Sequence, residues 1–220
     1  MRTLVVFTRF AALALVLIPS AAHADAPVSG SAEQALRVLL DGNRAFVAGA
    51  ASCPRQSPAR RNDVAAAQHP VAVVVGCADS RVPPEAIFGQ GIGDLFVIRV
   101  AGNVIDDTVL GSIEYAVEHL GAPLVIVLGH ERCGAVQAAL SPEPAHAHVD
   151  ALVRRIRAAI AEARSKPGDA LDNAVRANVA ASVREVQTSI PVLAPMVQQG
   201  RVKVVGARYD LDTGAVELVR

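Results

Sequence analysis

Three side chains that can bind a soft metal ion follow directly after two apolar stretches of this sequence. Cys77 comes after the run 71–76, and His130 and Cys133 come after the run 124–129. Thiolate and imidazole groups are preferred ligands of zinc. Three such ligands leave a fourth coordination position open, and an open position is typical of a catalytic zinc ion rather than a structural one.

Both apolar runs consist almost entirely of Val, Ile and Leu, as expected for strands that are buried on both faces of a parallel sheet. Binding sites in such sheets lie beyond the carboxyl ends of the strands, so the three ligands converge if the two strands are close. The chain has three cysteines, and a disulfide between Cys77 and Cys133 is the competing interpretation. We favour zinc because a disulfide leaves Asp79, Arg81 and His130 unexplained.

Asp79 and Arg81 follow Cys77 at intervals of two residues and are predicted to form a catalytic pair. Two thiolates neutralise the charge of zinc, so the ion acidifies a bound water less than it would with three imidazoles. Asp79 can orient that water, and Arg81 can keep the carboxylate ionised by a bidentate contact. If this pair opened, Asp79 could instead become the fourth ligand. The non-enzymatic alternative is an exported binding or scaffold protein with a structural zinc ion, although such sites usually have four Cys or His ligands.

Strands alternate with helices along the chain, which predicts an α/β fold with a central, mostly parallel sheet. Strands are expected at 71–75, 95–100, 124–128 and 201–207, with an antiparallel edge strand at 216–219. Helices are expected at 31–49, 58–67, 83–85, 108–120, 132–140, 149–165 and 170–190. The helix 132–140 should hold Cys133 in its first turn, and the His-x-x-Cys spacing should place both ligands on one helical turn. The helix 31–49 has an apolar face that needs a packing partner, which another subunit could supply.

The first 24 residues have the layout of a signal peptide. Arg2 and Arg9 are followed by a short apolar run, and small residues lead to Ala24. We expect cleavage there, a single domain over 25–220, a periplasmic location and no membrane attachment afterwards. The formal net charge of zero provides no basic surface for nucleic acid.

Several segments together resemble the β-class carbonic anhydrases. The segments 77–81 (CADSR) and 130–134 (HERCG) match the two zinc motifs of that family. The stretches 94–103, 111–117 and 209–214 are similar to it as well, and the resemblance covers about residues 31–219.

The resemblance implies one Zn²⁺ per chain, held by Cys77, His130 and Cys133, and zinc-bound hydroxide that attacks CO2 to give bicarbonate and a proton. Asp79 and Arg81 would form the catalytic dyad. The residues that would line the substrate pocket are Gln68, Phe96, Tyr115 and Gly134. The family also implies a homodimer or homotetramer with sites near the subunit interface.

Two alternatives to these implied roles remain. Some relatives use the same zinc site to hydrolyse carbonyl sulfide or carbon disulfide. From the residues alone, Phe96 and Tyr115 fit a plain core equally well, and Gln68 fits a loop cap.

Overall fold

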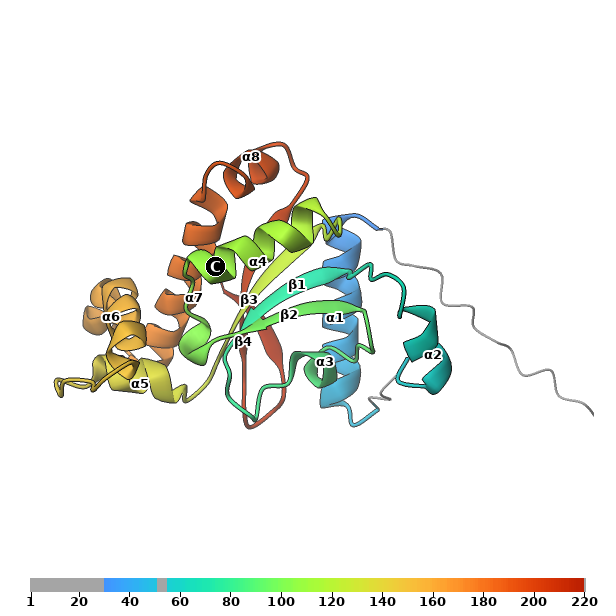
Figure 1. Cartoon of the computed structure of the whole chain (residues 1–220). Coiled ribbons are helices and arrows are strands. Elements are labelled where there is room, and N and C mark those ends of the chain that lie inside the picture. The colour runs from blue at the N-terminus through green and yellow to red at the C-terminus, as the bar shows by residue number, and fades with distance from the viewer. Residues whose placement is uncertain (1–29, 51–54, 220) are drawn as a thin grey trace, which may run out of the picture.

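A five-stranded sheet forms the centre of the molecule (Figure 1). The structure is a computed structural model that describes residues 30–50 and 55–219. The predicted signal peptide 1–24 and Cys53 lie outside the described residues. The strands, in the spatial order β2-β1-β3-β4-β5, are β2 (Leu95–Arg99), β1 (Ala72–Gly76), β3 (Leu124–His130), β4 (Lys203–Tyr209) and β5 (Val216–Val219). The first four are parallel and β5 is antiparallel to β4, so the predicted fold is confirmed.

Helices cover both faces of the sheet. They are α1 (Ala32–Val47), α2 (Pro58–Asp63), α3 (Pro84–Ile87), α4 (Asp107–Glu118), α5 (Gly134–Leu140), α6 (Val149–Ala159), α7 (Ala170–Thr188) and α8 (Leu193–Gln198), with 3₁₀ turns at Ala101–Asn103 and Ala161–Ser165. The helix predicted over 149–165 is therefore two pieces, and α2 ends four residues early. Helix α8 was not among the expected helices, and it contains Pro195, a residue type that usually breaks a helix. This proline lies in the first turn of α8, where its missing N–H has no helical partner to lose.

The alternation of side chains along β1 and β3 divides the core into two layers. Val73, Val75 and Val125 face one side, where α4, α7 and α8 pack. Val74 and Ile126 face the other side, where α1 and α3 pack. Because both faces are covered, every residue of β1 and β3 is buried, which explains their continuous apolar runs.

Two surfaces bear on how the chain could assemble. Helix α1 packs on the sheet of its own chain through Ala35 and Leu39, so its contact with a partner subunit stays a prediction. Strand β2 lies at the edge of the sheet and is only partly buried. Within the described ranges, no helix has both the length and the apolar character needed to cross a membrane.

Candidate metal centre

The three predicted ligands meet at the carboxyl edge of the sheet. Strand β1 lies beside β3 in parallel register, with Gly76 opposite Leu128, so the residues that follow the two strands come together. The sulfur atoms of Cys77 and Cys133 and an imidazole nitrogen of His130 all lie within 4.8 Å of one another. All three side chains are buried, and both cysteines are free, so the competing disulfide is not formed.

The turn that carries His130 and Cys133 differs from the prediction. Strand β3 extends through His130, and α5 begins only at Gly134, so Cys133 is the N-cap of α5 and not part of its first turn. Arg132 between them has φ +52°, a left-handed conformation that reverses the chain. The two ligands are therefore brought together by a tight turn between strand and helix, and the expectation of one helical turn was wrong. This placement lets backbone N–H groups of the first turn of α5 point at the Cys133 sulfur.

The His130 ring is oriented for binding through Nε2. Its Nδ1 lies 2.9 Å from the carbonyl oxygen of Glu131, so Nδ1 carries the proton and donates it there. Nε2 then presents a lone pair, and it is one of two buried side-chain atoms in the described residues that have no hydrogen-bond partner. A buried acceptor without a partner costs free energy. A metal ion that accepts the lone pair removes this cost.

The two cysteines shift each other's pKa in opposite directions. A hydrogen bond from Cys133 lowers the pKa of the Cys77 thiol, and the backbone N–H of Gly102 adds to this at 3.2 Å from Sγ. The same bond to Cys77, together with burial, raises the pKa of Cys133. Gly102 has φ +71°, a conformation that side chains rarely adopt, and a β-carbon there would displace the end of the Ile156 side chain, so glycine is favoured at this donor position. Two cysteine sulfurs and an imidazole nitrogen that meet in a buried site fit a zinc ion, which binds cysteine as the thiolate and releases its proton.

Asp79 and Arg81 form the predicted bidentate pair beside these ligands. Nε and one terminal nitrogen of Arg81 donate to the two carboxylate oxygens at 2.9 and 2.7 Å. These bonds hold the pKa of Asp79 well below its usual value. Oδ2 of Asp79 lies 3.7 Å from Nε2 of His130, so the carboxylate borders the space between the ligands.

Arg99 was not among the predicted site residues, yet it holds the loop that carries Cys77 and Asp79. Its Nε donates to the Cys77 carbonyl oxygen at 2.9 Å, and a terminal nitrogen donates to the Asp79 carbonyl oxygen at 2.5 Å. Arg99 ends β2 opposite Gly76, directly before the metal-binding loop. A charged residue at the end of an apolar strand was the signal in the sequence that could have identified it.

Comparison with known proteins gives the family. A model of the family described as carbonic anhydrase matches residues 72–216. A carbonic anhydrase of Mycolicibacterium smegmatis is 44% identical over 188 residues, which cover 84% of this chain and 91% of that protein. A β-carbonic anhydrase of Coccomyxa, solved in complex with acetazolamide, superposes with a TM-score of 0.68 at 31% identity and covers 84% of this chain and 86% of that one. The chain belongs to the β-class carbonic anhydrases.

A β-carbonic anhydrase from Sordaria macrospora, one of two described as tetrameric, has the same fold. It superposes with a TM-score of 0.69 over 84% of this chain and 97% of its own, at 24% identity. The central parallel sheet and its flanking helices are thus the architecture of this enzyme family.

The residues expected to line the substrate pocket of a β-class carbonic anhydrase are divided by the fold. Gly134 lies beside Cys133 at the first position of α5, and no atom would contact a β-carbon built there. Gln68 and Tyr115 line a separate hollow of about 610 Å³ together with His69 and His119.

This hollow lies away from the metal centre. Gln68 precedes β1 and Cys77 follows it, so a five-residue strand, roughly 17 Å long, separates them. The Phe96 ring lies 6.2 Å from that of Tyr115, and Tyr115 is 48% exposed. A single chain therefore does not bring Gln68, Phe96 and Tyr115 to its own Cys77, His130 and Cys133.

Proposed function

We propose that this chain catalyses the reversible hydration of CO2 to bicarbonate and a proton, with one zinc ion held by Cys77, His130 and Cys133. The observation that carries the proposal is the buried, unpaired Nε2 of His130, which meets the sulfur atoms of two buried cysteines. Membership of the carbonic anhydrase family supports the same reaction.

Zinc, when bound, would lower the pKa of water enough for a nucleophile to form near neutral pH. The chain itself would supply the remaining work. Asp79 borders the ligands at 3.7 Å from His130 Nε2 and would orient the attacking water by accepting one of its hydrogens. Arg81 keeps Asp79 ionised and turned toward the site through its two hydrogen bonds. The neighbouring Gly134 would leave room for a small substrate.

The proposal includes a homodimer or homotetramer in which a second copy completes the substrate pocket. Two features of this chain support the assembly: β2 is a partly buried edge strand, and Tyr115 beside it is half-exposed. An open edge strand is a ready surface for another chain. Gln68, Phe96 and Tyr115 of one copy would then face the zinc site of the other.

We also propose that the enzyme is exported to the periplasm after cleavage following Ala24. The charge and apolar pattern of residues 1–24 supports this. N-terminal sequencing of protein from a periplasmic fraction tests it: the chain should begin at Asp25, and intact protein confined to the cytoplasm would contradict it.

Carbonyl sulfide or carbon disulfide hydrolysis is not proposed. The relatives reported above are named carbonic anhydrases, and none of those names refers to either substrate.

Stopped-flow measurement of CO2 hydration tests the proposed reaction, with zinc quantified in the same sample. We expect fast hydration in proportion to zinc content, abolished when a chelator removes the metal and restored when zinc is returned. One zinc per chain without hydration above the buffer rate, at pH 7 and at pH 8.5, would overturn the proposal.

A further inference from the structure

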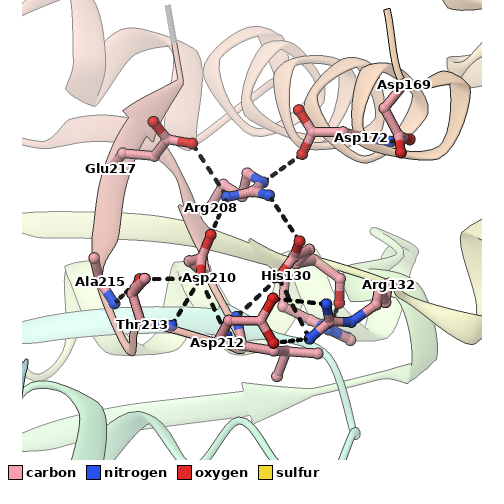
Figure 2. Close-up of polar contacts among 12 residues, drawn as sticks. His130, Arg132, Asp169, Asp172, Arg208, Asp210, Asp212, Thr213, Ala215 and Glu217 are labelled. Carbon is pink, nitrogen blue, oxygen red and sulfur yellow. Dashed lines mark hydrogen bonds and ion pairs between the residues drawn. The ribbon is translucent and has the colours of Figure 1, made fainter.

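The turn between His130 and Cys133 is tied to the hairpin that joins β4 to β5. Two terminal nitrogens of Arg132 donate to the two carboxylate oxygens of Asp212 at 2.8 and 2.6 Å. Figure 2 shows this pair, with Arg208 above it between the carboxylates of Glu217 and Asp172. Asp212 lies in the hairpin, so a residue remote in sequence holds the turn that carries two of the ligands.

Glu131 makes the second connection between the turn and the hairpin. Its backbone N–H donates to the Tyr209 carbonyl oxygen at 2.9 Å, and its carboxylate accepts from the Leu211 N–H at 3.2 Å. Arg208, only 8% exposed, lies 3.7 Å from the same carboxylate. The Glu131 carbonyl oxygen is the group that accepts the hydrogen bond of His130 Nδ1. The hairpin thus fixes the acceptor that orients the metal-binding ring.

The hairpin is itself held in place, so it can serve as a support. Oδ1 of Asp210 accepts from the N–H groups of Asp212 and Thr213 at 3.1 and 2.9 Å, which fixes the turn around Asp212 (Figure 2). The buried Asn43 of α1 bonds the other side of the hairpin, donating to Gly214 and accepting from Val216. A rigid neighbour of this kind can hold a left-handed Arg132, which costs free energy in an isolated chain.

The geometry points to Arg132 and Asp212 as positioning residues for the zinc site: their bidentate contact holds the reversed turn in the shape that brings His130 and Cys133 to the metal. This inference rests on the proposed zinc site. Neither residue touches the metal or the substrate; both act through the turn. Their side chains are 49% and 67% exposed, so solvent weakens the ion pair and its effect should be modest.

The test measures the zinc dissociation constant of the full-length protein by competition with a chelator. The variants are Asp212→Asn, Arg132→Ala and the double variant, and Glu33→Gln is the matched control. Glu33 forms a comparably exposed ion pair with Lys203, at the opposite end of β4 from the metal site. The absorption spectrum of the cobalt(II)-substituted protein reports the ligand geometry, and the melting temperature of the metal-free protein reports whether each variant folds.

Because partners of metal ligands typically change affinity by 10- to 100-fold and this pair is exposed, we expect weakening of about 3- to 10-fold in each single variant. The double variant should lose no more than either single variant, since both remove the same contact. The cobalt spectrum should shift in all three, whereas Glu33→Gln should match the wild type in both measurements.

This inference alone would be overturned if Asp212→Asn bound zinc as tightly as the wild type. It would also be overturned if Glu33→Gln lost as much zinc affinity as Asp212→Asn. A wild-type protein that binds no zinc would overturn the proposed metal site, and this inference with it.

Discussion

The two ends of the parallel strands carry different sites: a buried cluster of expected metal ligands and an open hollow. At the carboxyl end, Cys77, His130 and Cys133 are buried and converge within 4.8 Å, and groups of the same chain bond Cys77 Sγ and His130 Nδ1. At the amino end, Gln68 and Tyr115 line an open hollow beside a partly buried edge strand. The contrast fits the proposal that one chain supplies all three metal ligands, whereas a second chain completes the substrate pocket.

Removing one of the three expected ligands should abolish metal binding at the carboxyl end of the strands. Cys133→Ser should lower zinc affinity by at least about 100-fold, more than the loss of a residue that only supports a ligand, and should abolish CO2 hydration. Zinc content and stopped-flow rates measure this. Cys53→Ser is the matched control, because Cys53 is not an expected ligand. Full zinc occupancy in Cys133→Ser would contradict the assigned site.

Replacing Asp79, which also lies at the carboxyl end of the strands, should separate metal binding from catalysis. Asp79→Ala removes the acceptor for the attacking water but leaves all three ligands, so zinc should stay while turnover falls about 100-fold. Asp79→Asn keeps the size and tests the charge. Unchanged turnover in both variants, with zinc present, would remove Asp79 from the mechanism.

Mixing two inactive variants should show whether the pocket spans two copies. Cys133→Ser keeps the pocket and loses the metal, whereas a Gln68→Ala/Tyr115→Ala double variant keeps the metal and loses the pocket. If each site combines one chain's metal with the other chain's pocket, half of the dimers formed at random from equal amounts regain one intact site, or about a quarter of wild-type activity. No recovery after unfolding and refolding the mixture, when each variant also dimerises alone, would mean that the pocket belongs to a single chain.

The sequence was sufficient to predict the buried strands and the three side chains that gather beyond their ends, although it did not give the order of the strands in the sheet. Continuous apolar runs identify strands that are buried on both faces, and Cys77, His130 and Cys133 follow those runs directly. The turn at Arg132 could not be predicted, because the left-handed conformation of a non-glycine residue depends on the contact with Asp212, far along the chain. The role of Arg99 was not predicted for a similar reason, because its contact with the Cys77 carbonyl oxygen requires that β2 lie beside β1.

Acid should weaken the hairpin through Asp210. Hydrogen bonds from the Thr213 backbone, then from the Thr213 hydroxyl and the Asp212 N–H, lower the pKa of Asp210 from 3.8 to about 2. A pKa that is lower in the folded state contributes stability above the unfolded value, and this contribution is lost as the pH falls from about 4 through 2.

Urea unfolding of the metal-free protein at pH 7 and pH 2.5 measures this effect. Because solvent screens the partly exposed Asp210, Asp210→Asn should cost up to about 1 kcal/mol at pH 7 and less at pH 2.5. An equal cost at both pH values would exclude the carboxylate charge as its source.

The position of the ligands along the chain also determines when metal can be taken up. His130 and Cys133 are neighbours in sequence, but Cys77 lies 53 residues before His130 and meets the other two ligands only when β1 pairs with β3. An unfolded chain therefore offers zinc only a weak, two-ligand site. An ion that binds the folded state alone stabilises it by mass action, by about 2.7 kcal/mol at a free concentration 100 times the dissociation constant. The lifetime of this enzyme against heat and proteases should consequently depend on the supply of zinc around it.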